Sequence, residues 1–279
     1  MAELTFDSGA FRGHLRTRRL GRALFVRAAV ESTNDVAWTL AQDGAPDGAC
    51  VVADLQTRGR GRQGRTWHTT PGRALALSLV LHPGCDRTAV ALAPLVAGVA
   101  LSRALETLGV TAVLKWPNDL LVEGRKISGI LVESRRDTGG AEIVIMGVGV
   151  NVAQNADEFP AELRDRATSI ALAGSDAGRE QVAAEFLNAL EPAWDEHQEG
   201  DPRRALDAWR DRAKGFWGQT VSVASPAGNV AGVARDLDER GGLVIEQAGG
   251  RLVTVVAGDL DLAPQPSEAP EPGGRGTRA

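Results

Sequence analysis

The sequence is poor in cysteine, histidine and long apolar runs, and each scarcity excludes a class of protein. Its two cysteines, Cys50 and Cys85, are too few and too isolated for a disulfide framework or a cysteine-based metal site. The four histidines show neither an HExxH pattern nor a paired-ligand spacing, so a zinc site is unsupported. No apolar run approaches the roughly 18–20 residues needed to cross a bilayer, and residues 1–10 lack the features of a signal peptide. We expect a cytoplasmic protein without a membrane partner.

Charge and lysine usage narrow the choice further. The formal net charge is −5, which disfavours a general nucleic-acid binder but leaves room for a local cationic pocket. Only three of the 31 basic residues are lysines: Lys115, Lys126 and Lys214. One explanation is a compositional bias towards arginine. The other is that a retained lysine supplies a compact ammonium where a planar guanidinium would not serve.

Hydrophobic patterning predicts an α+β or mixed α/β main body followed by a small all-β unit. In the main body, strands are expected at 24–30, 49–55, 74–81, 113–122, 126–134 and 143–152, and helices at about 33–42, 88–108, 179–198 and 202–214. Pro94 fits the second of these helices only near its first turn. Short β segments at 220–224, 229–237, 242–247 and 251–257 predict a small barrel. The expected units are an extension (1–23), a catalytic domain (24–214), the barrel (215–262) and a disordered tail (263–279).

An arginine–glycine segment directly after the second expected strand carries the strongest chemical signal. Residues 56–67 read QTRGRGRQGRTW. Glycines let the backbone approach a ligand, and successive N–H groups can form an anion-binding nest. The neighbouring arginines add donors suited to carboxylate or phosphate. The alternatives are a solvated flexible loop or an RNA-binding arginine–glycine stretch, with Gln56 and Trp67 as packing residues.

Three further segments carry polar groups in apolar surroundings. Lys115 interrupts an apolar strand before Pro117-Asn118-Asp119, which is typical of a turn, so the lysine either reaches solvent or meets an anion. Glu123-Gly124 is a hairpin signal, and such a hairpin would place Lys115 and Lys126 on neighbouring strands, where they could converge on one ligand. The glycines of 147–151 (GVGVN) indicate either close packing or a ligand ring lying against the backbone, with Asn151 facing a base edge. Ser32, Thr33 and Asn34 are typical of a helix cap, which can also present N–H groups to a ligand.

No residue pattern indicates a nucleophile supplied by the protein. The sequence has no GxSxG elbow, and neither cysteine has a recognisable nucleophile context. The chain therefore offers cationic stabilisation without an obvious covalent nucleophile. That combination favours a reaction in which one substrate activates another.

Taken together and in this order, five segments closely resemble the biotin–protein ligase family. They are STN at 32–34, QTRGRGRQGRTW at 56–67, KWPND at 115–119, GRKISGILVE at 124–133 and GVGVN at 147–151. The resemblance spans roughly residues 24–262 and implies a mixed-sheet biotin/lipoate ligase-like fold, similar to class II synthetases, followed by an SH3-like barrel. About 23 residues precede it, so we expect the short class without a DNA-binding domain.

The resemblance implies two half-reactions. Biotin and ATP form biotinyl-5′-AMP and pyrophosphate with Mg²⁺, and a lysine of a biotin carboxyl carrier protein or carboxylase domain then takes the biotin while AMP leaves. The protein ligands of the metal are left unknown; Mg²⁺ is expected mainly on the phosphates, with Asp54 and Asp119 as candidates for indirect contact. The loop at 58–66 is expected to close when ligand arrives.

The family's functional residues carry over to matching positions of this sequence. The catalytic set is Lys115, Arg60, Arg62 and Lys126, with Lys115 bridging the biotin carboxylate and the α-phosphate. The implied biotin-binding residues are Ser32, Thr33, Asn34, Gln56, Gly59, Arg60, Gly61, Arg62 and Lys115. The implied ATP-binding residues are Arg62, Arg65, Trp67, Lys115, Asn118, Lys126 and Asn151.

Other functions remain as alternatives at this point. A lipoate or octanoate ligase shares the fold and the acyl-adenylate chemistry, but its usual phosphate-loop pattern is absent here. A nucleic-acid-binding module built on the arginine–glycine loop is disfavoured by the net charge and by the lack of aromatic stacking motifs. The oligomeric state is open between a monomer and a weak dimer.

Overall fold

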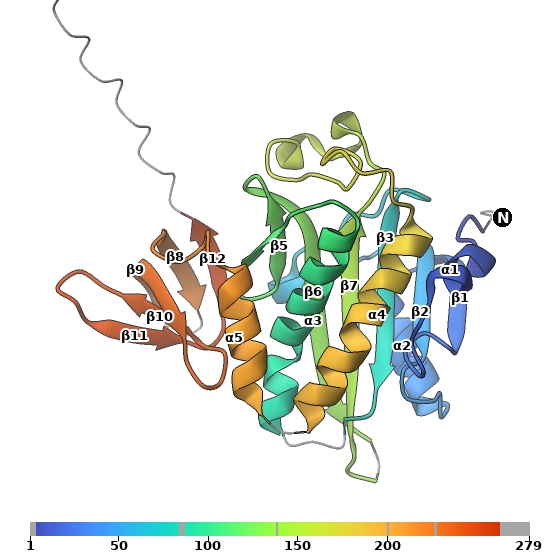
Figure 1. The fold of residues 1–279 in the computed structure, drawn as a ribbon, viewed down its shortest axis with the longest axis horizontal. Helices are drawn as coiled ribbons and strands as arrows, with labels where there is room; N and C mark the ends of the chain where they lie inside the picture. Colours follow the sequence, from blue (N-terminus) through green and yellow to red (C-terminus); the bar gives the residue numbers. More distant parts are fainter. Residues whose placement is uncertain (1–3, 84–86, 138, 200, 226–227, 263–279) are drawn as a thin grey trace, which may run out of the picture.

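The computed structural model describes residues 4–83, 87–137, 139–199, 201–225 and 228–262, drawn in colour in Figure 1. A seven-stranded sheet forms the main body, with helices on both faces, and a smaller sheet follows it. The tail expected to be disordered, 263–279, lies outside the described residues.

The large sheet is mixed. Its strands are β1 (Leu24–Val30), β2 (Cys50–Gln56), β3 (Ala74–Leu81), β4 (Val113–Lys115), β5 (Asp119–Val122), β6 (Arg125–Arg136) and β7 (Glu142–Asn151). They lie in the order β1-β2-β3-β7-β6-β5-β4. Only β1 and β2 are parallel neighbours; the other pairs are antiparallel. The expected α+β class is therefore confirmed.

Alternation along the strands divides the interior into two layers. The helices are α1 (Ser8–His14), α2 (Thr33–Gln42), α3 (Arg87–Thr107), α4 (Arg179–Gln198) and α5 (Pro202–Arg212). On β2, Val52 belongs to the large cluster with α3 and α4, whereas Val51 belongs to the small cluster with α2. Successive strand residues point to opposite faces, so α2 covers one face and the other helices cover the opposite one (Figure 1).

Helix α3 corrects two expectations. Pro94 lies well inside the helix and not near its first turn, so the carbonyl of Val90 loses its usual N–H partner. Burial of neighbours such as Leu92 and Leu95 offsets that loss. Within α3, Val90–Thr107 is also apolar and long enough, by composition alone, to cross a membrane, but 67% of this window is buried. The helix is therefore part of the protein core, where it packs against α4 and the sheet.

The predicted single strand 113–122 is two antiparallel strands. β4 and β5 pair Val113 with Leu121 and Lys115 with Asp119, and the chain reverses at Trp116–Pro117, whose peptide bond is cis. The second reversal, between β5 and β6, occurs at Glu123 and Gly124, as the hairpin signal predicts. Both residues have positive φ, the conformation that a tight two-residue hairpin requires.

The residues before β1 pack against the main body. Phe6, Phe11, Leu15 and Leu20 are buried in the same core cluster as α3 and α4. Thr5 donates two hydrogen bonds to the buried Asp54 carboxylate, which also pairs with Arg179 at 2.7 Å. Helix α1 was missed by the sequence reasoning because Phe11 is its one buried side chain.

The C-terminal unit is a five-stranded antiparallel sheet. Its strands are β8 (Thr220–Ser225), β9 (Gly228–Leu237), β10 (Leu243–Glu246), β11 (Leu252–Val255) and β12 (Asp259–Leu262), in the order β11-β10-β9-β8-β12. The last strand was not expected. The unit meets the main body where the buried Trp116 indole donates to the Gly241 carbonyl at 2.9 Å. β12 thereby reaches the cavity described next.

Candidate active site

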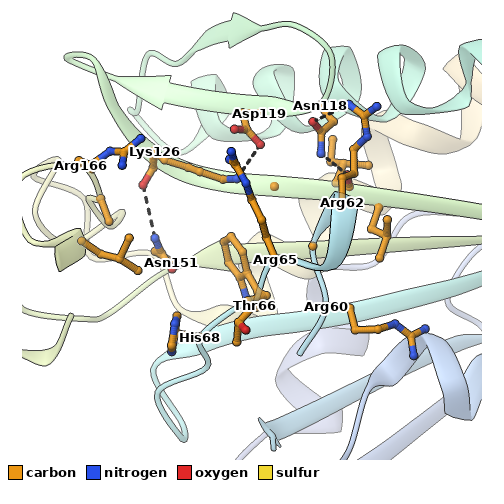
Figure 2. A pocket seen from close by; sticks show the side chains of 18 of the residues that line it. Arg60, Arg62, Arg65, Thr66, His68, Asn118, Asp119, Lys126, Asn151 and Arg166 are labelled. Carbon is orange, nitrogen blue, oxygen red and sulfur yellow. Dashed lines mark hydrogen bonds and ion pairs between the residues drawn. The ribbon is translucent and has the colours of Figure 1, made fainter. Parts of the chain in front are cut away.

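A cavity of about 740 Å³ opens beside β6 and β7, between the loop of residues 57–73 and the segment of residues 152–178 (Figure 2). It contains almost all of the sequence-predicted site residues: Ser32, Thr33, Asn34, Gln56, Arg60, Gly61, Arg62, Arg65, Trp67, Lys115, Asn118, Lys126 and Asn151. Gly59 is not part of the lining. Residues far apart in the sequence thus meet at one place.

One end of the cavity is a network of uncharged polar groups. The Gln56 side-chain carbonyl accepts from the Thr33 backbone N–H at 2.8 Å and from the Thr33 hydroxyl at 3.0 Å. Gln56 therefore satisfies a free N–H group at the start of α2. Ser32 occupies the cap position, but its hydroxyl makes no capping hydrogen bond although the residue is buried. This end suits a ligand that both donates and accepts hydrogen bonds.

The arginine–glycine loop is folded back on itself. The Gly61 N–H donates to the Arg65 carbonyl at 2.7 Å, and the Trp67 N–H donates to the Gly59 carbonyl at 2.9 Å. A Cβ on Gly59 would lie 2.4 Å from the Trp67 carbonyl oxygen, so only glycine allows this approach. The N–H groups of Gly61 and Trp67 are thus bonded inside the loop and do not form the expected anion nest.

Three arginines of the loop have different surroundings. Arg58 is exposed and pairs with Glu31 at 3.2 Å. Arg60 pairs with Asp35 and Glu133 and is exposed. Arg62 faces the cavity, with a long contact of 3.4 Å to the Asn118 side-chain carbonyl (Figure 2). Burial lowers the pKa of Arg62, with the charge of Asp119 opposing. A partly desolvated guanidinium gains most from an anionic partner.

The two lysines meet the same carboxylate from different strands. Lys126 pairs with Asp119 at 2.7 Å, and Asp119 is the register partner of Lys115. The hairpin interpretation, which placed Lys115 and Lys126 on neighbouring strands, is therefore wrong, because β5 lies between β4 and β6. Burial lowers the pKa of Lys115, partly opposed by the charges of Asp119 and Asp261. Among the described residues, no carboxylate lies within ion-pair distance of the Lys115 ammonium.

Glycines on β6 and β7 make room for protein side chains. A Cβ on Gly149 would lie 2.3 Å from the Trp67 ring, and one on Gly147 would lie 2.3 Å from the Asn34 amide oxygen. The packing interpretation of GVGVN therefore holds in this structure. The Lys126 ammonium lies 5.8 Å from the Trp67 ring centroid, which is cation–π distance.

Two asparagines fix loops beside the cavity. The Asn118 amide nitrogen donates to the Ile130 carbonyl at 2.6 Å. The Asn151 amide nitrogen donates to the Thr168 carbonyl at 2.9 Å, and its oxygen accepts from Gln154 at 3.1 Å. Asn151 is buried, so its amide holds the segment of residues 152–178 against β7.

Several lining or supporting residues were missed by the sequence reasoning. Ser78, Asp35 and Glu133 bond to predicted site residues, and Arg166 and Asp261 line the cavity. None stands in a pattern with a recognisable spacing, so no sequence signal was available beyond Glu133 closing the GRKISGILVE segment. Asp54, a candidate for indirect metal contact, pairs with Arg179 and Thr5 in the core and is absent from the lining.

Comparisons with known proteins identify the family of the chain. Residues 26–151 match the biotin/lipoate A/B protein ligase family, and residues 216–262 match the biotin protein ligase C-terminal domain. The biotin–[acetyl-CoA-carboxylase] ligase of Mycobacterium tuberculosis is 36% identical over 247 residues, covering 86% of this chain and 88% of that protein. The bifunctional ligase/repressor BirA of Bacillus spizizenii is 34% identical over 250 residues, covering 89% and 76%.

A solved structure extends the likeness to the fold. The biotin protein ligase from Aquifex aeolicus, in complex with biotin and ATP, superposes with a TM-score of 0.75 at 31% identity. The match covers 87% of this chain and 99% of that one. With the C-terminal match, it confirms a second domain consistent with an SH3-like fold. From its motifs, its fold and its relatives, this chain belongs to the biotin protein ligase family.

Proposed function

We propose that this chain is an ATP-dependent ligase that joins biotin to a lysine of a carboxylase. The main support is a single cavity that has an uncharged polar end and is also lined by Lys115, Lys126 and Arg62. The relatives from Mycobacterium tuberculosis and Paracoccus denitrificans are both biotin–[acetyl-CoA-carboxylase] ligases. The C-terminal match to biotin protein ligases favours biotin over lipoate as the acid.

In the first half-reaction, a carboxylate oxygen of biotin attacks the α-phosphorus of ATP. The new bond is the acyl–phosphate bond of biotinyl-5′-AMP, and the broken bond releases pyrophosphate. Two anions must approach each other, so charge neutralisation and positioning dominate the barrier. Lys115 bridges the two anions, because this half-buried side chain lines the cavity and no carboxylate is within ion-pair distance of its ammonium among the described residues.

The polar end of the cavity binds the ureido ring of biotin. Ser32, Thr33 and Gln56 present hydroxyl, amide and backbone groups there, supported by Asn34. The loop of residues 57–73 covers the carboxylate and the phosphates: Gly59 and Gly61 shape its backbone, Arg60 helps it to close, and Arg62 supplies the charge that meets these anions.

The nucleotide lies on the β6 and β7 side. Arg65, Trp67, Asn118, Lys126 and Asn151 line this part of the cavity. Trp67 covers the nucleotide with its ring, and Lys126 serves the phosphates and the second transfer. Asn118 holds Arg62 in place, and Asn151 shapes the adenine side through the segment of residues 152–178.

In the second half-reaction, the amine of an acceptor lysine attacks the acyl carbon of biotinyl-5′-AMP. An amide bond forms, the acyl–phosphate bond breaks, and AMP leaves. Excluding water matters here, because the mixed anhydride hydrolyses. The acceptor is a biotin carboxyl carrier domain, and the reaction takes place in the cytoplasm.

Mg²⁺ accompanies the nucleotide. Over the described part of the chain, no group of three or more His, Cys, Asp or Glu side chains could hold a metal ion. The ion would be carried mainly by the phosphates of the nucleotide and would neutralise part of their charge. Asp119 is the candidate protein contact, because it lines the cavity between the two lysines.

A transfer assay tests the proposal. Purified protein is incubated with biotin, ATP, Mg²⁺ and a recombinant biotin carboxyl carrier domain, and the products are followed by mass spectrometry and nucleotide analysis. One biotin on one lysine, with stoichiometric AMP and pyrophosphate, is the expected result. Biotin incorporation without ATP consumption, or no incorporation by the folded protein, would contradict the proposal.

A further inference from the structure

Among the contacts between the loop of residues 57–73 and the main body, those of the Arg60 side chain reach two separate elements. The Arg60 guanidinium lies 2.6 Å and 2.8 Å from the two carboxylate oxygens of Asp35 in α2. It also donates to the Glu133 carboxylate of β6 at 3.2 Å. Figure 2 shows Arg60 on the side of the view away from Lys126 and Asn151. One loop residue thus joins two elements on different sides of the loop.

The same carboxylate continues into the polar end of the cavity. Glu133 Oε2 accepts from the Asn34 amide at 2.7 Å, and the Asn34 oxygen lies 2.7 Å from the Ser78 hydroxyl. Ser78 is in turn 2.7 Å from the Thr33 hydroxyl. An unbroken chain of polar contacts therefore runs from the proposed biotin end to the loop.

We infer that Asp35 and Glu133 are positioning residues that hold the loop closed over the cavity through Arg60. In the proposed reaction, closure retains the acyl-adenylate between the two half-reactions. This consequence rests on the proposed function. The contacts of Arg60 with Asp35 and Glu133, here called the latch, are present in the structure itself. Asp35 and Glu133 act through Arg60 and do not touch the reacting atoms.

Arg60 and Arg62 have different roles in the loop. Burial alone would lower the pKa of Arg60, but hydrogen bonds and charge from Asp35 and Glu133 raise it. Its charge is already balanced by two carboxylates, so it anchors the loop. Arg62 has no carboxylate in contact in the described structure and is more buried, so it is the loop arginine that meets the anionic ligand.

Amide hydrogen exchange of the ligand-free protein tests the latch directly. The Gly61 and Trp67 N–H groups, which are bonded inside the loop, serve as reporters. We expect Asp35→Asn and Glu133→Gln each to speed their exchange about three- to fivefold, the effect of losing one partly exposed ion pair on a local opening equilibrium. Glu31→Gln is the matched control, because it removes the exposed Arg58–Glu31 pair of the same loop. It should change exchange by less than about twofold.

A double-mutant cycle with Arg60→Gln separates the latch from other roles of the two acids. Asp35 also lies in the first turn of α2, where any acidic residue stabilises the helix. If Asp35 acts through Arg60, Asp35→Asn does not speed the exchange of the reporter amides further in the Arg60→Gln background. An additive effect there, or unchanged exchange in both single variants, would overturn the inference.

Release of biotinyl-5′-AMP supplies the functional readout. Asp35→Asn and Glu133→Gln should raise the ratio of free adenylate to biotin on the acceptor about three- to fivefold. Asp35→Glu keeps the carboxylate, so its ratio should lie closer to the wild-type value than that of Asp35→Asn. A faster-exchanging loop with an unchanged ratio would overturn the retention role. If wild-type protein forms no adenylate, the proposed function fails while the exchange experiment still decides the latch.

Discussion

At the residue scale, the site is cationic chemistry without a protein nucleophile. Lys115, Lys126 and Arg62 come from three different elements, and each lines the cavity. Asp119 lies between the lysines and limits their mutual repulsion, because it pairs with Lys126 and opposes the lowering of the Lys115 pKa.

Lys115→Ala should reduce biotin-dependent ATP–pyrophosphate exchange by about 10²–10³-fold or more, because it removes the cation between two reacting anions. Lys214→Ala is the matched control, since Lys214 is exposed and pairs only loosely with Asp211 at 3.7 Å. Both variants should unfold at the wild-type temperature. Exchange near the wild-type rate in Lys115→Ala would refute the assigned role.

Arg62→Gly should loosen retention of the adenylate. Arg62 is the loop arginine without a carboxylate contact in the described structure, so its loss removes charge from the ligand and leaves the latch in place. Free biotinyl-5′-AMP should then label lysines of a bystander protein, as detected by streptavidin blotting. Labelling that stays confined to the acceptor domain would show that Arg62 does not retain the intermediate.

At the element scale, the N-terminal segment and α4 brace the strand that leads into the loop. Asp54 on β2 is buried and accepts from Thr5 and Arg179. The strand ends two residues later at Gln56, which contacts Thr33 in the polar end of the cavity. A buried ion pair in this position fixes the strand from behind.

Breaking this buried pair should be costly and pH-dependent. Arg179→Met leaves an unpaired buried carboxylate, which costs about 3–5 kcal/mol of unfolding free energy at pH 7. Burial opposes ionisation, but hydrogen bonds from Thr5 and Arg179 hold the pKa of Asp54 below its ordinary value. Its stabilisation is therefore present above about pH 4 and lost as pH falls through the folded-state pKa.

Urea unfolding at a series of pH values measures both effects. The stability gap between wild type and Asp54→Asn should shrink as pH falls below about 4, because protonation then removes the charge from the wild-type pair. A gap that stays constant down to the lowest pH at which both fold would show that the Asp54 charge contributes nothing.

Helix α1 is attached to the protein core through one buried side chain. Phe11 is fully buried and packs at 5.8 Å, centroid to centroid, from Phe6. Phe11→Ala should cost about 3–5 kcal/mol of unfolding free energy. Arg12→Ala, an exposed neighbour on the same helix, should change it by less than about 0.5 kcal/mol. Equal effects would mean that α1 is not part of the core.

The sequence predicts elements where local pattern and burial agree. The apolar runs of β1 and β3 and the amphipathic pattern of α4 gave the observed bounds. Residues 113–122 were predicted as one strand because apolar residues stand at both ends of the segment, yet the chain reverses at Pro117 between them. Helix α1 escaped because a single buried Phe11 carries no periodicity.

The candidate site was predictable as a set of motifs but not as a network. Lys115, Gln56 and Arg62 stand in recognisable segments, and they do line one cavity. The partners Asp35, Ser78 and Glu133 depend on contacts across the sheet, which no local spacing encodes. The glycine roles also required the structure, because Gly149 accommodates Trp67 from a distant loop.

At the scale of the whole molecule, the C-terminal sheet closes one side of the cavity. Trp116 holds it through the Gly241 carbonyl, and Arg210 of α5 pairs with Asp236 of β9 at 2.6 Å. These contacts bring β12 to the cavity, where Asp261 lies among its lining residues. Both domains therefore contribute to one site. The chain as a whole carries a net charge of −5, but Lys115, Lys126 and Arg62 bring positive charge into the cavity.

The most direct test of the central claim is ATP–pyrophosphate exchange by the purified protein with Mg²⁺, comparing biotin, lipoate and no acid. Exchange that requires biotin and is absent with lipoate is the predicted result, since it reports reversible formation of biotinyl-5′-AMP. Exchange with lipoate would keep the fold and the adenylate chemistry but change the substrate. No exchange with either acid, in a sample shown to be folded, would contradict the account.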